Sequence, residues 1–232
     1  MKFKFYLYAV LFSSIIGGCV NEKNKEPKQK TKLTAKDILG NSDYLAISYG
    51  GYREKSRDIQ PTLEELKDDM KILHAMNIRI LRTYNTKLEQ ASTILKAISE
   101  LKKEDSSFEM FVMLGDWIDC DNAWISELNH NAASKENEEE IARAVSLAKQ
   151  YPDIVKIIAV GNEAMVKWAT SYFVQPWVIL KWVNHLQDLK KNGELSKDLW
   201  ITSSDNFASW GGGSDEYHIE DLKKLIHAVD YI

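Results

Sequence analysis

Along the chain from residue 44, short apolar runs alternate with longer segments whose apolar residues repeat every three or four positions. The short runs are typical of strands, and the longer segments are typical of helices that bury one face. We expect strands at 44–52, 78–85, 110–118, 155–163 and 199–205. Helices are expected at 61–76, 88–103, 138–150, 175–191 and 217–229, with a loop at 129–140 and a sixth strand beginning at Asp230.

This alternation of strand and helix favours a parallel α/β sheet. Strands that begin at Tyr44, Leu199 and Asp230 give a repeat of about 37 residues, and eight such units make a (β/α)₈ TIM barrel of about 300 residues. A doubly wound open sheet uses the same alternation. We favour the barrel because no G-x-G-x-x-G follows the first strand, and because every strand ends in polar residues, which a barrel gathers around one mouth. These residues are Tyr49; Arg82, Tyr84 and Asn85; Asp116 and Trp117; Asn162 and Glu163; Ser203 and Asp205.

Residues 1–18 have the layout of a secretory signal peptide, with two early lysines, an apolar stretch and two glycines at its end. The Cys19 that follows resembles the lipidated cysteine of bacterial lipoproteins. The resemblance implies an exported protein that is lipid-anchored to a bacterial membrane, on the periplasmic or the cell-surface side. An ordinary cleaved signal with an incidental cysteine is the alternative. We interpret 19–40 as a polar tether and 41–232 as the folded domain.

The composition narrows the class of protein further. The chain has 232 residues, of which 44% are apolar and 28% charged, as is typical of a soluble domain. The formal net charge is −4 and the basic residues are scattered, so we expect no nucleic-acid partner. The five histidines show no metal-ligand spacing, and no metal or organic cofactor is expected. Cys120 is interpreted as a small packed residue without a disulfide partner.

The segment Val160-Gly161-Asn162-Glu163 is the sharpest candidate for chemistry. An apolar strand delivers an amide and a carboxylate side by side, and barrel walls would desolvate the carboxylate, as a general acid requires. The amide is suited to hydrogen-bond a substrate hydroxyl. The same pair is compatible with a polar strand end that caps the following helix, so the residue types alone leave both interpretations open.

Three segments together resemble the family 17 glycoside hydrolases, which are β-1,3-glucanases: 158–163 (IAVGNE), 81–85 (LRTYN) and 48–50 (SYG). The resemblance implies a barrel with an acid/base Glu at the end of strand four and a nucleophile Glu at the end of strand seven. It assigns Glu163 as the acid/base and Asn162 as the amide that holds the sugar 2-hydroxyl. Strand seven, and with it the nucleophile, is absent from these 232 residues.

Further side chains are candidates for contact with a sugar. The resemblance implies that the floor of the site is formed by Tyr49, Arg82 and Tyr84. Sugar faces stack on flat indoles, and we assign this role to Trp117, Trp168 and Trp210. Asp205 is compatible either with a sugar contact or with a cap of the loop before Phe207.

We therefore expect a lipid-anchored, monomeric glycoside hydrolase that cleaves β-1,3-glucan such as laminarin with retention of configuration. A non-catalytic glycan-binding lipoprotein and a β-glucan transglycosylase are the alternatives. Because only about five of eight repeats are present, we expect the chain to be a fragment of a protein of roughly 340 residues. Expressed alone, such a fragment is expected to aggregate and to be inactive, because its apolar strand edges are open.

Overall fold

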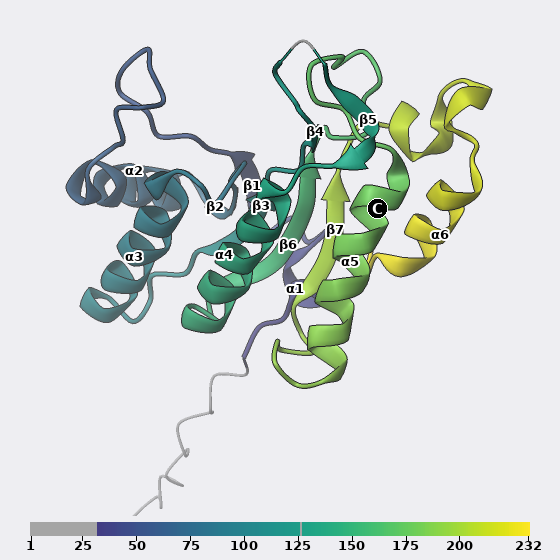
Figure 1. Cartoon of the computed structure of the whole chain (residues 1–232). Coiled ribbons are helices and arrows are strands. Elements are labelled where there is room, and N and C mark those ends of the chain that lie inside the picture. Colours follow the sequence, from purple (N-terminus) through teal and green to yellow (C-terminus); the bar gives the residue numbers. More distant parts are fainter. Residues whose placement is uncertain (1–31, 126) are drawn as a thin grey trace, which may run out of the picture. The chain divides into compact units, whose positions relative to one another are not determined.

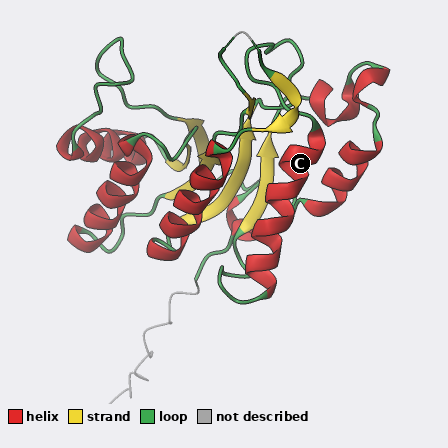
Figure 2. Cartoon of the chain, viewed as in Figure 1, coloured by secondary structure: helices red, strands yellow, loops and turns green. Residues whose placement is uncertain are grey.

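The computed structural model describes residues 32–125 and 127–232 (Figures 1 and 2). Its strands are β1 (Leu45–Ser48), β2 (Ile78–Arg82), β3 (Phe111–Asp116), β4 (Cys120–Asp121), β5 (Asn129–Ala133), β6 (Val155–Asn162) and β7 (Trp200–Ser204). Its helices are α1 (Ala35–Ile38), α2 (Leu63–Ala75), α3 (Glu89–Glu104), α4 (Glu136–Gln150), α5 (Pro176–Lys191) and α6 (Glu220–Ala228), with the short helical turns η1 (Ala208–Gly212) and η2 (Asp215–Tyr217). None of the helices in these residues has the length and apolar character to cross a membrane.

The expected signal peptide at 1–18, Cys19 and the tether as far as residue 31 lie outside the described residues. The remainder of the expected tether does not behave as one. Ile38 of α1 is fully buried and packs with Ile80 of β2 and Phe111 of β3. The prediction of a tether up to residue 40 is therefore wrong for this part, because one short apolar turn is enough to cover the base of the sheet.

Strands β1, β2, β3, β6 and β7 form one sheet in that order, and all of its neighbouring strands are parallel. The predicted parallel α/β sheet is thus confirmed. The described sheet is not closed, because β1 and β7 are not paired with each other and form its two edges. An open sheet is what about five of eight units predict, and the (β/α)₈ barrel itself stays a prediction. A (β/α)₈ barrel closes with eight strands, and the described sheet has five.

The two faces of the sheet are covered differently. Leu81, Val112 and Ile158 belong to the main core, to which helices α2 to α6 contribute their apolar faces. The neighbouring residues Ile80 and Phe111 point the other way, onto α1. The long helices therefore pack on one face (Figure 1), whereas a doubly wound sheet carries helices on both faces.

The segment 129–140 is not the loop that we expected. Asn129–Ala133 pairs antiparallel with Cys120–Asp121, and α4 begins at Glu136. The side chains of β5 are exposed or half-buried, so this strand has no apolar alternation from which it could be predicted. Its pairing is determined by its neighbour rather than by its own sequence.

The sixth strand expected at Asp230 does not form, although Asp230 and Tyr231 lie beside β7 and are hydrogen-bonded to it. The Asp230 N–H donates to the Ile201 carbonyl at 2.8 Å, and the Asp230 carboxylate accepts from the Ile201 N–H at 2.6 Å. Lys190 of α5 donates to the same carboxylate at 2.7 Å. The Asp230 carboxylate thus accepts the Ile201 N–H, which the backbone carbonyl of a neighbouring strand would otherwise accept.

Replacing Ile38 by Ala should lower the free energy of unfolding by about 2–4 kcal/mol, because it opens a cavity between α1 and the sheet. The matched control is Lys36→Ala in the same helix, whose side chain is exposed and which should change stability by less than about 0.5 kcal/mol. Urea unfolding followed by circular dichroism measures both values. Equal stabilities of the two variants would show that α1 is not part of the core.

Candidate active site

Strand β6 ends in an unusual backbone conformation that presents Asn162 and Glu163. Gly161 has a φ of +86°, and a Cβ at this position would approach Ala164 to 2.9 Å and Ile179 to 3.0 Å, so a larger residue does not fit. Glu163 also has a positive φ, of 49°, which is uncommon for a non-glycine residue and costs free energy. Its N–H donates to the Ser204 carbonyl of β7 at 2.7 Å, which holds the strained residue in place.

Arg82 and Asn162 meet on the face of the sheet that the long helices leave free. An Nη2–H of Arg82 donates to the Asn162 Oδ1, and the guanidinium carbon lies 5.6 Å from the centre of the Tyr84 ring. The structure therefore brings together three of the predicted residues: Arg82, Tyr84 and Asn162. Because the amide oxygen is occupied by Arg82, the Nδ2 hydrogens of Asn162 are the groups left to bind a ligand.

The Glu163 side chain is exposed, whereas we expected barrel walls to desolvate it. The reason is the open sheet, because no further strand stands beyond β7 in the described part of the chain. Its position directly after Asn162 at the carboxyl end of β6 is as predicted. Its role as acid/base stays a prediction.

Asp205 supports the loop that follows Glu163. The Met165 N–H donates to Asp205 Oδ1, and the Ser203 hydroxyl donates to Oδ2, both at 2.9 Å. Burial raises the pKa of this carboxyl to about 6, the charge of Glu163 adds to the rise, and these hydrogen bonds and the charge of Arg82 oppose it. The expected cap before Phe207 is thus replaced by a tie to the β6 loop, and a sugar contact of Asp205 stays a prediction.

Tyr49 does not lie with Arg82 and Asn162. Its hydroxyl donates to the Asp69 carboxylate of α2, which also accepts from Arg53 at 2.8 and 2.9 Å. Ser48 is paired with Arg82 in the sheet, so the next residue along the strand faces the helices. The prediction that Tyr49 lines the floor of the site is therefore wrong on this geometry.

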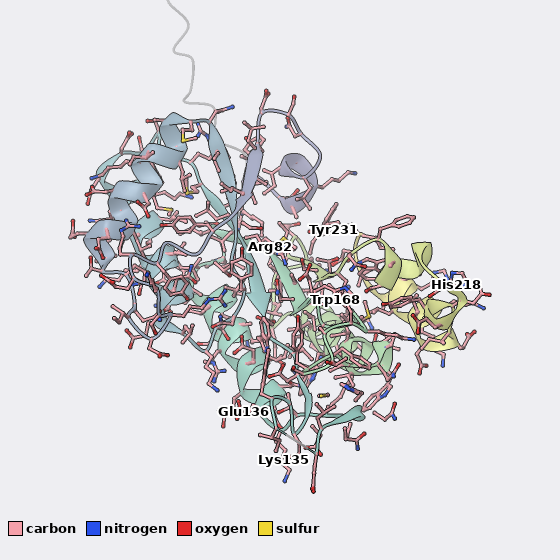
Figure 3. The ribbon with its side chains drawn as sticks, turned by 90° about the horizontal axis from the view of Figure 1, so that it is seen from above. Arg82, Lys135, Glu136, Trp168, His218 and Tyr231 are labelled. Atoms are coloured by element: carbon pink, nitrogen blue, oxygen red, sulfur yellow. The ribbon has the colours of Figure 1, made fainter. Side chains whose placement is uncertain are left out.

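The predicted stacking tryptophans differ in exposure. Trp168 follows β6 and is 71% exposed (Figure 3). Trp210 is half-buried and packs against the main core, so little of its indole is open to a sugar. Trp117 lies in an aromatic group with Trp124 and Tyr172, at ring-centre distances of 6.4 Å and 5.2 Å.

Sequence reasoning did not single out Tyr231 or Tyr172, and it placed Asp116 at the mouth of the barrel. Tyr231 lies on the Arg82 face, with its hydroxyl 4.0 Å from Met113 Sδ, and burial raises its pKa to about 12. Tyr172 lies ten residues after the end of β6, in a segment where no motif points to it. Asp116 was expected at the mouth, but it is fully buried towards α4, and burial raises its pKa well above the usual value.

These features define an α/β protein with a polar site at the carboxyl end of a parallel sheet, where such folds bind their ligands. No protein-family model and no curated protein matches the chain. Among solved structures, the chain is similar to an endo-laminarinase from Formosa Hel1_33_131, with 75% sequence identity and a TM-score of 0.85. The match covers 86% of this chain and 51% of that chain, so this chain spans about half the length of that relative.

Asp205→Asn should weaken the pH dependence of stability. The pKa of Asp205 is about 6 in the folded state and 3.8 ordinarily, so the folded protein keeps this proton to a higher pH than the unfolded chain does. The wild-type protein therefore loses stability as the pH rises from about 4 to 6, because the folded state must give up a proton that it binds more tightly than the unfolded state does. Asn carries no titrating proton, so the variant should lack this loss, which amounts to at most about 3 kcal/mol. Urea unfolding at pH 4 and pH 7 measures the difference. The exposed Asp198→Asn should follow the wild type; a parallel pH dependence of Asp205→Asn and wild type would refute the assignment.

Proposed function

We propose that the chain is part of a family 17 glycoside hydrolase that cleaves internal bonds of β-1,3-glucan of the laminarin type. The observation that carries the proposal is the 75% identity with an endo-laminarinase over 86% of this chain. The proposed substrate is a polysaccharide or oligosaccharide, and we propose that the protein acts as a monomer.

Two features support a (β/α)₈ barrel for the complete fold. Helices α2 to α6 cover one face of the sheet, as the outer ring of such a barrel does. Strand β1 leaves Leu45 and Ile47 47% and 39% exposed. Apolar side chains on a strand edge favour further pairing, and closure of a barrel would supply it.

The proposed reaction is a retaining two-carboxylate mechanism, in which Glu163 is one of the two carboxylates. Glu163 would protonate the leaving glycosidic oxygen and later deprotonate the attacking water. Asn162 would donate from Nδ2 to the sugar 2-hydroxyl, because Arg82 holds its Oδ1. The nucleophile carboxylate would come from the seventh strand of the complete barrel. The described parallel sheet has five strands, of which the strand labelled β7 is the fifth. Tyr84, Trp117, Trp168 and Asp205 are proposed to contact the glucan.

Glu163→Gln in the full-length protein should reduce the turnover of laminarin by roughly 100-fold or more, because the amide cannot donate and recover a proton. Release of reducing ends measures turnover, and the exposed Glu64→Gln in α2 is the matched control with unchanged rates. Thermal unfolding shows that both variants are folded. Undiminished turnover of Glu163→Gln would sink the assignment, and products longer than the substrate would indicate transglycosylation.

We also propose an exported protein that is anchored through a lipid on Cys19, on the periplasmic or the cell-surface side of a bacterial membrane. Cys19→Ser should then move the protein from the detergent-rich to the aqueous phase in Triton X-114 partitioning of bacterial cells. Cys120→Ser is the control, because Cys120 is buried in the core and should leave partitioning unchanged. A Cys19→Ser protein that still partitions with detergent would argue against the anchor.

A further inference from the structure

A cleft opens beside the carboxyl ends of β2 and β3, away from the residues assigned to catalysis. Its volume is about 770 Å³, and its walls come from the loops after β2 and β3 and from the start of α4. Arg82, Asn162 and Glu163 do not line it. Figure 3 shows the same separation, because Lys135 and Glu136 of the cleft lie at the periphery and Arg82 lies nearer the centre.

One wall of the cleft is aromatic. Trp117 and Trp124 both line it, and Tyr172 packs against them with ring-centre distances of 5.2 Å and 5.1 Å. We call these three side chains the indole platform. The Trp124 side chain is 60% exposed, although an indole gains much from burial. A large exposed aromatic surface at the edge of a cleft marks a place where a ligand packs.

The indole platform is held rigidly before any ligand arrives. Trp124 has a φ of 69°, and its N–H donates to the Ser171 carbonyl at 2.9 Å. The indole N–H of Trp117 donates to Asp119 Oδ1 at 2.7 Å. Asn137 fixes Asp119 in turn, because its amide bonds both the N–H and the carbonyl of that residue, at 3.0 Å and 2.8 Å. Because the position of Trp124 is already fixed, little further conformational entropy is lost when a ligand binds.

The charges of the cleft favour an uncharged ligand. Four basic and four acidic side chains line it, so it carries no excess of either sign to select a phosphate or a cation. Lys87 pairs with Glu136 at 3.0 Å, and Arg143 pairs with Glu140 at 2.7 Å. Amide and carboxylate groups beside flat aromatic rings are the combination that fits a sugar, with its hydroxyl rim and its CH-rich face.

The platform is connected to the acid/base candidate by one loop, because Glu163 and Tyr172 both belong to the segment between β6 and α5. Burial is the main cause that raises the pKa of Tyr172, and the negative charge of Glu163 is the next. We expect a glucan held at Glu163 to extend along this loop to Tyr172 and on to Trp117 and Trp124.

We propose that this cleft is a second carbohydrate-binding site, in which the indole platform holds glucosyl units of the substrate that are remote from the bond being cleaved. This inference rests on the proposed glucanase function and adds where the distal part of the substrate lies. Trp124 is the residue that contacts these units most openly. The site raises the affinity for long glucans and does not take part in the chemical step.

The test compares long and short substrates of the full-length protein. Trp124→Ala should raise the KM for laminarin about 2- to 10-fold, and it should leave kcat/KM for the shortest cleaved oligomer unchanged. Trp124→Phe keeps an aromatic face and should recover most of the loss. Ile125→Ala is the matched control, because Ile125 is exposed in the same loop but does not line the cleft. Thermal unfolding of each variant reports its folding.

A binding measurement separates this inference from the proposed function. Titration calorimetry of laminarin with the Glu163→Gln protein should show binding that Trp124→Ala weakens by the same factor. If Glu163→Gln binds laminarin in this way but the wild type does not cleave it, the proposed function fails and the second site stands. An unchanged KM for laminarin in Trp124→Ala, or equal losses with long and short substrates, overturns the second site.

Discussion

The alternation of side chains along β2, β3 and β6 is the constraint on which the site depends. Leu81, Val112 and Ile158 are held against the helices by apolar burial, which contributes about 1.5–3 kcal/mol for each large side chain. Residues one position away must then face the opposite side, and a slip of one residue would exchange the two sets. The core thus fixes Arg82 on the face where it meets Asn162.

Buried carboxylates behind the strand ends fix the loops that carry the candidate ligand contacts. Glu140 of α4 is 3% exposed and accepts hydrogen bonds from the N–H groups of Thr86 and Trp117, which follow β2 and β3. A buried N–H without a partner is costly, so this one side chain stabilises both loops. Asp205 does the same for the loop after β6, through Met165. The loops after β2 and β3 are therefore positioned from α4, and the loop after β6 is positioned from the end of β7.

The strands and helices of the main sheet could be predicted, because their periodicity reports burial directly. Helix α2 begins with a capping box, in which Thr62 accepts from the Glu65 N–H and Glu65 accepts from the Thr62 N–H. Three outcomes depended on contacts that a pattern does not contain. Tyr49 turns to Asp69, β5 pairs with β4, and Ile38 finds Phe111 across more than 70 residues of sequence. Each of these is set by partners distant in the chain, which override local preference.

The guanidinium of Arg82 connects these elements electrostatically. Burial raises the pKa values of Asp205 and Tyr231, and the charge of Arg82 opposes both rises. Glu163 must give and regain a proton if it is the acid/base, which changes the local charge by one unit in each cycle. The bond from Arg82 to the Asn162 Oδ1 does not involve the Glu163 carboxyl, so it persists in both states. In the proposed mechanism, the Nδ2 hydrogens of Asn162 therefore bind the substrate whichever form Glu163 takes, so that one residue would hold the sugar while another moves the proton.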